Sequence, residues 1–215
     1  MGPEATAELY LRIIRIFQTR YGARDDADFP RIFICSVPLP DVVGSVDTGD
    51  EVRDCLITAA MQLESVGCDF IAVPCNTVSY FLQDIRSSLS IPVLSVPEEV
   101  AKIVKRDNFE KVGLLATAMT IKKDLYGSVL KEVEIIVPTK EKTDILTKVI
   151  LNLMSGNKLE EDRRVINGMI KNLQEKGAER IILGCTELPL LIRTNRVVID
   201  TIEVLAEAIV KRAIP

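Results

Sequence analysis

CDFIAVPCNT (residues 68–77) and AERIILGCTE (residues 178–187) share one plan, in which a short apolar run leads directly to a cysteine. The two cysteines, Cys75 and Cys185, are 185 − 75 = 110 positions apart. Continuous apolar runs of this length are typical of strands in a parallel sheet that is covered on both faces. Each cysteine is therefore expected just beyond the carboxyl end of such a strand, where ligands bind in open α/β sheets.

The segments that precede the two runs, residues 50–67 and 160–177, also match each other. Both carry apolar residues three and four positions apart, as one buried helix face requires. Gly67 and Gly177 stand where the helices should end, and glycine suits a left-handed cap because it has no Cβ. The chain thus contains one helix-strand-cysteine unit twice.

Outward from these units, the sequence predicts an α/β fold of two similar flavodoxin-like lobes. Each lobe has a parallel sheet, a pseudo-two-fold relates the lobes, and an active-site cleft lies between them. The first lobe comprises residues 1–96 with 201–215, because the last helix, 202–212, is expected to return to it. The second lobe comprises residues 97–200. Further strands are predicted at residues 31–37, 91–96, 111–116, 133–137 and 197–200.

The repeat also predicts a gap in the first lobe. In the second lobe, the strand KVGLLAT (residues 111–117) precedes a segment ending KKDLYGSVL, whereas the first-lobe counterpart of that segment, EATAELYLRII, stands at the start of the chain. The first lobe then lacks its first strand. We expect either that the sequence begins late or that this lobe is one strand short.

Composition narrows the classes of function. The 215 residues are 47% hydrophobic and 27% charged with a net charge of −4, so no basic surface for nucleic acid or anionic lipid is expected. No apolar run is long enough to span a membrane, and the first residues do not resemble a secretion signal, which predicts a cytoplasmic protein with a small-molecule partner. With no histidine, proton transfer falls to Cys, Asp, Glu, Lys or Tyr, and no metal site is predicted.

PCNT (residues 74–77) and GCTEL (residues 184–188) resemble the paired signatures of aspartate racemases and of the wider Asp/Glu/hydantoin racemase family. GLLATAMTI (residues 113–121) resembles the family's Ala-Thr-x-x-Thr loop. MGPEATAELY (residues 1–10) resembles the family segment that follows the first strand. The resemblance covers nearly the whole chain and implies a racemase that acts on amino acids, with aspartate as the first candidate substrate and a homodimer as the candidate assembly.

The resemblance implies that Cys75 and Cys185 are catalytic. One thiolate removes the α-proton while the opposed thiol protonates the other face, without pyridoxal phosphate or metal. A helix N-terminus with N–H donors is expected to lower the pKa of the thiol that acts as base. The implied substrate-binding residues are Asn76, Thr77, Thr117, Thr120, Thr186 and Glu187.

Each of these residues has a plainer interpretation. Free cysteines are commonly buried and inert, and we assign Cys35, Cys55 and Cys68 to that class. A disulfide between Cys75 and Cys185 is a lesser alternative. Asn and Thr are favoured helix caps, so Asn76, Thr77 and Thr186 could serve only as caps.

The sequence departs from the aspartate racemase pattern where a distal carboxylate would be held. Val42 stands in place of an expected arginine and Met154 in place of an expected lysine, while Val78 and Ser79 replace Ala-His after PCNT. A buried carboxylate without a cationic partner costs several kcal/mol, so these residues leave open which amino acid is the substrate. Lys122, Lys123 and Arg53 could supply charge, although a solvated helix face is the more common place for such residues.

Three functions remain open at this point. The first is a cofactor-independent amino-acid racemase, with aspartate as the leading substrate. The second is a related enzyme of the same superfamily with another substrate, and the third is a non-catalytic metabolite-binding relative that has lost turnover.

Overall fold

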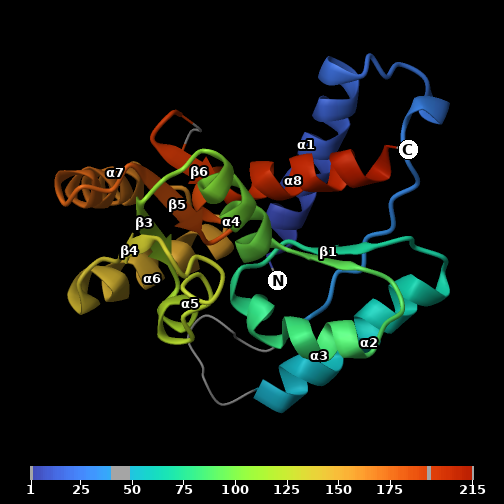
Figure 1. Ribbon diagram of the computed structural model, residues 1–215, viewed down its shortest axis with the longest axis horizontal. Coiled ribbons are helices and arrows are strands. Elements are labelled where there is room, and N and C mark those ends of the chain that lie inside the picture. Colours follow the sequence, from blue (N-terminus) through green and yellow to red (C-terminus); the bar gives the residue numbers. More distant parts are fainter. Residues whose placement is uncertain (1, 40–48, 193–194, 215) are drawn as a thin grey trace.

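Two parallel β-sheets organise the computed structural model, which describes residues 2–39, 49–192 and 195–214 (Figure 1). The first sheet consists of β1 (Ile71–Val73) and β2 (Val93–Ser95), paired from Ile71↔Val93 to Val73↔Ser95. The helical elements of this half are α1 (Pro3–Arg20), the short 3-10 helix η1 (Asp26–Asp28), α2 (Gly49–Ser65), the 3-10 helix η2 (Thr77–Phe81) and α3 (Leu82–Ser87). Helix α4 (Val96–Arg106) then leads to the second sheet.

The second sheet has four parallel strands in the order β4-β3-β5-β6. Its strands are β3 (Lys111–Ala116), β4 (Glu134–Ile136), β5 (Arg180–Gly184) and β6 (Val198–Asp200). The connecting elements are α5 (Ala118–Lys122), α6 (Lys140–Met154), α7 (Glu160–Glu175), the 3-10 helix η3 (Leu188–Leu190) and the final helix α8 (Thr201–Ala213). The α/β class with parallel sheets in two groups is therefore confirmed.

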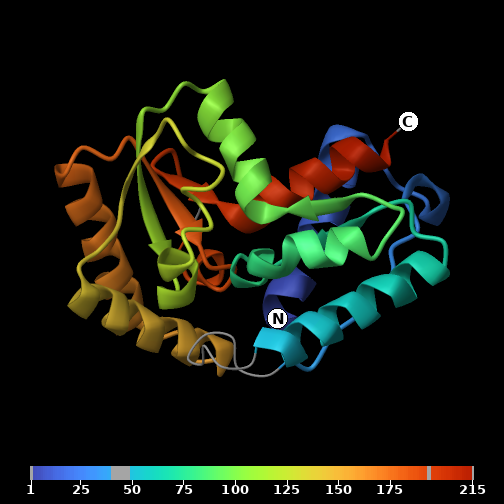
Figure 2. The ribbon, with the colours of Figure 1, turned by 60° about the horizontal axis from the view of Figure 1, so that its bottom comes forward.

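Three helices form a layer that serves both sheets. Apolar side chains of α1, α4 and α8 share one core with Leu94 of the first sheet and with Val112, Leu114 and Ile182 of the second. Helices α2 and α3 cover the other face of the first sheet, while α6 and α7 cover the other face of the second (Figure 2). The last helix, α8, packs along α1.

Ion pairs add to the contact between α1 and α8. Arg12 of α1 donates to the carboxylate of Asp200 at 2.6 Å and to that of Glu203 at 3.2 Å. The Asp200 side chain also caps α8, since it accepts from the backbone N–H groups of Ile202 and Glu203. The chain is thus fixed where it passes from the second sheet to the shared helical layer.

The predicted repeat is present in the structure. Helices α2 and α7 precede β1 and β5, and Gly67 and Gly177 follow these helices with φ values of 86° and 96°, in the left-handed region that favours glycine. Both cysteines of the repeat therefore follow the carboxyl end of a parallel strand.

One predicted strand is absent. Residues 31–37 adopt no regular secondary structure, although their sequence is rich in the residues that favour strands. A strand needs a neighbour that accepts and donates backbone hydrogen bonds, and a cavity of about 910 Å³ lies between this segment and β1. Without that neighbour, the apolar pattern alone does not produce a strand.

Within the described ranges, no helix combines the length and the apolar character that a membrane crossing requires.

Candidate active site

Both repeat cysteines lie in the loops after the strands that correspond to each other. Cys75 follows β1, and its backbone N–H donates to the carbonyl of Val73 at 2.8 Å. Cys185 directly follows β5 and is buried, with 6% of its surface exposed, whereas Cys75 is partly buried. Burial and Glu187 raise the pKa of Cys185, and the charge of Cys75 adds to this effect. The two sulfur atoms therefore belong to one electrostatic environment.

Asn76 is held by a tyrosine from the other half of the chain. The hydroxyl of Tyr126, 50 positions away, donates to Asn76 Oδ1 at 2.6 Å, and both side chains are buried. Among the residues that the structure describes, the amide nitrogen Nδ2 of Asn76 is buried and has no hydrogen-bond partner. A buried donor without an acceptor costs about 1–3 kcal/mol, so it identifies a place where a ligand acceptor would be favourable.

Three threonine hydroxyls converge beside Asn76. The Thr77 hydroxyl lies 3.1 Å from that of Thr117 and 3.2 Å from that of Thr120, and the Thr117 and Thr120 hydroxyls are 3.0 Å apart. All three side chains are buried. Thr117 also caps α5 by accepting from the backbone N–H of Thr120. The structure thus joins residues that the sequence had placed in different lobes.

Glu187 and Thr186 complete the contact on the Cys185 side. The Cys185 thiol donates to Glu187 Oε2 at 2.9 Å. The Thr186 hydroxyl lies 3.3 Å from the same oxygen and 3.3 Å from the carbonyl of Pro74, the residue before Cys75. Two sets of hydrogen bonds thus cross the junction of the two halves at residues 74–77, one through Asn76 and Thr77 and the other through Thr186.

The capping interpretation does not describe Asn76, Thr77 or Thr186. The Asn76 side chain makes no cap hydrogen bond at η2, and its oxygen is bound by Tyr126 instead. Thr77 and Thr186 each bond across the junction. Their hydrogen bonds serve the contact between the halves rather than a local helix end.

The expected lowering of the thiol pKa is wrong for this structure. Burial raises the pKa of both Cys75 and Cys185, and the charge of Glu187 raises each further, with Cys185 well above its ordinary value. The backbone N–H groups of Val78 and Thr77 lower the pKa of Cys75, as the helix N-terminus argument required, but burial outweighs them. Both thiols are therefore protonated in this state.

Tyr126 is the residue that sequence reasoning missed. Its partner is far away in the sequence, so no spacing could connect the two residues. The only available signal was general, since a buried tyrosine hydroxyl usually finds a hydrogen-bond partner. Burial also raises the pKa of Tyr126, which keeps the hydroxyl protonated as a donor.

The substituted positions lie in different surroundings. Val78 is buried in the core of the first sheet, and Met154 is 48% exposed at the end of α6. Val42 lies outside the described residues. The ammonium group of Lys123 lies 4.3 Å from the ring centroid of Tyr80 in η2, whereas Arg53 pairs with Asp50 and Asp54 on its own helix.

Cys35, Cys55 and Cys68 are partly buried and lie outside this group, with Cys35 and Cys68 lining the cavity beside β1. In the part of the chain that the structure describes, no three Cys, Asp or Glu side chains gather as metal ligands would.

Residues 1–209 match the family model described as Asp/Glu/Hydantoin racemase. The chain belongs to this family. It is 30% identical to the broad specificity amino-acid racemase RacX of Bacillus subtilis over 189 residues, which cover 87% of this chain and 82% of the relative. It is 26% identical to a glutamate racemase of Deinococcus radiodurans over 167 residues, 73% of this chain and 58% of that protein.

The family fold is also shared. The structure of an aspartate racemase from Picrophilus torridus matches with a TM-score of 0.85 and 25% identity, over 99% of this chain and 90% of that one. The two flavodoxin-like lobes predicted from the repeat are therefore confirmed.

Removing the Tyr126 hydroxyl tests the contact across the junction. Tyr126→Phe leaves Asn76 Oδ1 buried without its donor, so the free energy of unfolding should fall by about 1–3 kcal/mol in denaturant titration. Tyr21→Phe, at a tyrosine that is 55% exposed, is the matched control and should change it by less than about 0.5 kcal/mol. Equal effects of the two substitutions would contradict a specific role for the hydroxyl.

Glu187→Gln tests the electrostatic account of the thiols. The substitution removes a negative charge that raises the pKa of both cysteines, so thiolate absorbance in the ultraviolet should appear at lower pH than in the wild type. Adding Cys185→Ser should remove most of the shifted signal, since Cys185 is bonded directly to Glu187. A titration that moves to higher pH would contradict this account.

Proposed function

We propose that the protein is a cofactor-independent amino-acid racemase in which Cys75 and Cys185 act on opposite faces of the substrate α-carbon. The observation that carries the proposal is the placement of the two thiols after equivalent strands, β1 and β5, in one group of polar side chains. Inversion through a planar carbanion needs one proton acceptor and one proton donor, and a thiol can serve as either.

Side chains near the two thiols offer hydrogen-bond donors to the α-carboxylate of the substrate. Asn76 offers an amide N–H that has no partner within residues 2–39, 49–192 and 195–214, and the hydroxyls of Thr77, Thr117 and Thr120 lie within hydrogen-bond distance of one another. When a carboxylate binds, these hydroxyls exchange their mutual bonds for charge-assisted bonds, which are shorter and stronger. The same donors stabilise the negative charge that develops on the carboxylate as the α-proton leaves.

The substrate itself supplies the charge that the base needs. With both thiols protonated, neither can act as a base until one pKa falls. The α-ammonium group, oriented by Glu187, brings a positive charge next to the thiols, and a nearby opposite charge favours the thiolate. Binding and activation of the base are thus coupled.

The two cysteines together then account for every proton that is transferred. One thiolate takes the α-proton and becomes a thiol, while the opposed thiol gives its proton to the other face of the carbanion and becomes the thiolate. The enzyme ends each turnover with the two protonation states exchanged, so the reverse reaction starts from the product form. No redox step is involved.

Aspartate is the first substrate to test, because the signatures resemble those of aspartate racemases and the Picrophilus torridus protein carries that name. The panel should extend to glutamate and to small neutral amino acids, since RacX is named a broad specificity racemase. Met154 is half exposed and aliphatic, so it offers no charge to a distal carboxylate. Among the cationic side chains, the ammonium group of Lys123 contacts Tyr80 of η2.

Racemisation by thiol variants tests the function. Purified protein incubated with single enantiomers of the panel should produce the opposite enantiomer, measured by chiral chromatography. Cys75→Ala and Cys185→Ala should each lower kcat by about 10²–10⁴-fold, the usual contribution of a general acid or base. Cys68→Ala, a partly buried cysteine outside the group, is the control and should retain the activity.

Two results would count against the proposal. Turnover that survives both alanine substitutions would exclude the thiol mechanism. Thermal stabilisation by an amino acid without inversion of any member of the panel would favour a metabolite-binding protein instead.

A further inference from the structure

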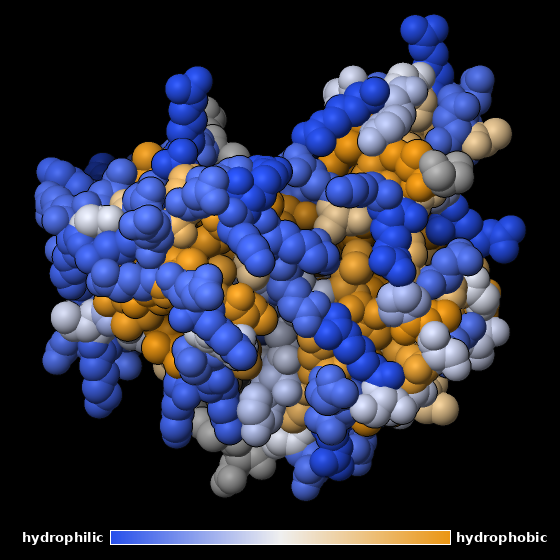
Figure 3. Space-filling view, viewed as in Figure 1, coloured by the Kyte–Doolittle hydropathy of each residue, from blue (hydrophilic) through white to orange (hydrophobic). Residues whose placement is uncertain are grey.

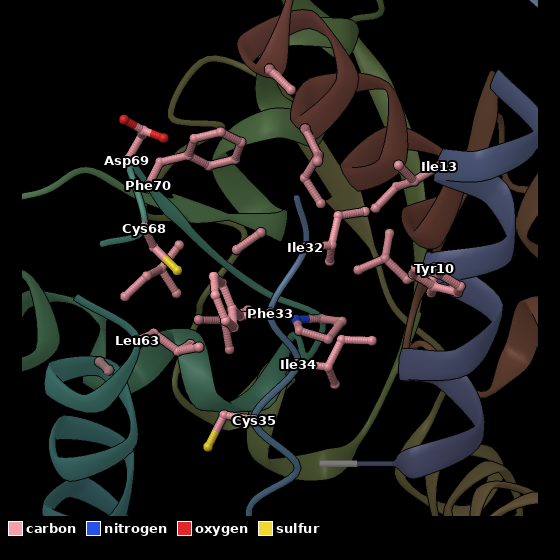
Figure 4. A pocket seen from close by; sticks show the side chains of 18 of the residues that line it. Tyr10, Ile13, Ile32, Phe33, Ile34, Cys35, Leu63, Cys68, Asp69 and Phe70 are labelled. Carbon is pink, nitrogen blue, oxygen red and sulfur yellow. The ribbon is translucent and has the colours of Figure 1, made fainter. Parts of the chain in front are cut away.

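A cavity of about 910 Å³ lies beside β1, between this strand and residues 30–35 (Figure 4). Helices α1 and α8 contribute Leu9, Ile13 and Ile209 to its lining, and α2 contributes Leu56 and Leu63. Residues of β2 do not line it, so the cavity occupies the edge of β1 that β2 leaves open. We call this cavity the strand slot.

The second lobe shows what fills the equivalent place there. By the repeat, β1 corresponds to β5 and β2 to β6, and residues 31–37 follow α1 as β4 follows α5. In the second sheet β3 lies between β4 and β5, paired in parallel with both. The strand slot lies between the first-lobe counterparts of β4 and β5, so it is the position that β3 occupies in the other lobe.

Exposure of apolar residues in the two lobes supports this correspondence. Ile181, Ile182 and Leu183 of β5 are 0% exposed, whereas Ala72 and Val73 of β1 are only partly buried. Around the strand slot, Tyr10, Phe33 and Ile34 are 40%, 44% and 53% exposed. Apolar atoms accordingly reach the surface over the β1 side of the molecule (Figure 3). The neighbour that would cover them is the one that β3 provides in the second lobe.

The required ligand chemistry follows from the lining. The two broad faces of the strand slot are apolar helices, which accept apolar side chains on both sides of a strand, as the buried side chains of β3 show. The two narrow edges are formed by the backbone of β1 on one side and of residues 31–35 on the other. The backbone N–H and C=O groups at these edges need hydrogen-bond partners. An extended peptide supplies both, whereas a compact apolar ligand leaves the edges unpaired.

We propose that the strand slot binds one extended apolar peptide segment, parallel to β1 and about as long as β3. Binding pairs the segment with β1 on one edge and converts residues 31–35 into a strand on the other. The first sheet then has the same four-stranded order as the second. Because Cys75 follows β1, the bound segment also fixes the strand that positions this thiol.

A peptide with the sequence of residues 111–117, KVGLLAT, is the probe, because this segment fills the equivalent place in the second lobe. Added to the full chain at roughly tenfold above its Kd, it should raise the midpoint of thermal unfolding by about 3 °C or more. Hydrogen exchange should slow at residues 31–35 and 71–73. The matched control is the same peptide with Leu114→Pro and Ala116→Pro, which lacks two backbone donors and should do neither.

Tethering tests the direction of the strand. Gly2 lies against Glu187, at the carboxyl-end edge of the sheets, so KVGLLAT fused in place of Met1 can enter the strand slot parallel to β1. This fusion should be more thermostable than one that carries the reversed sequence TALLGVK. If the fusion stabilises the protein but the free peptide does not, the proposal still holds, and the affinity of the strand slot for the free peptide is weaker. Absence of both stabilisation and local protection, or equal effects of the proline or reversed controls, would overturn it.

Discussion

The structure depends on a contact between a first-lobe loop and second-lobe side chains that is made through hydroxyl groups. Tyr126 holds the Asn76 amide, and Thr117 and Thr120 meet the Thr77 hydroxyl. These groups are buried, so each bond made across the junction avoids the cost of an unsatisfied polar group. The same bonds fix the direction of Asn76 Nδ2, a buried donor that has no partner among the described residues. On the proposed function, stability and ligand recognition share one set of contacts.

Burial has the opposite effect on the two thiols. It places Cys75 and Cys185 in one protected environment, but it also raises the pKa of each and keeps both neutral in the absence of a ligand. A racemase with this arrangement gains its base only when a cationic amino group enters. On the proposed mechanism, this dependence protects the thiols from ionisation, and hence from oxidation, between turnovers.

Much of the fold was predictable from the sequence because the helix-strand-cysteine unit occurs twice in it. The helix period, the glycine caps and the apolar runs before Cys75 and Cys185 are local signals, and the structure has each of them. Residues 31–37 have an equally strong apolar pattern but form no strand. A strand forms only where a neighbouring strand pairs with it, and the segment alone does not provide that neighbour. The strand slot lies where this neighbour would be, and it forms only when the helices and strands of the lobe pack together.

The residues of the candidate site were predictable from the sequence, but the hydrogen bonds between them were not. Motif resemblance identified Asn76 and Thr77, yet it gave no reason to include Tyr126, whose contact is long-range. The direction of the thiol pKa was also misjudged, because burial depends on the packing of both halves.

Isotope incorporation during turnover in deuterated buffer tests the central claim, that two thiols act on opposite faces of one carbon. At low conversion of a single enantiomer, the account predicts that the product carries deuterium at the α-carbon while the recovered substrate carries almost none, because the acceptor and donor are different groups. Mass spectrometry of the separated enantiomers measures both. Equal deuterium in substrate and product from the start would indicate one group serving both faces and would contradict the account.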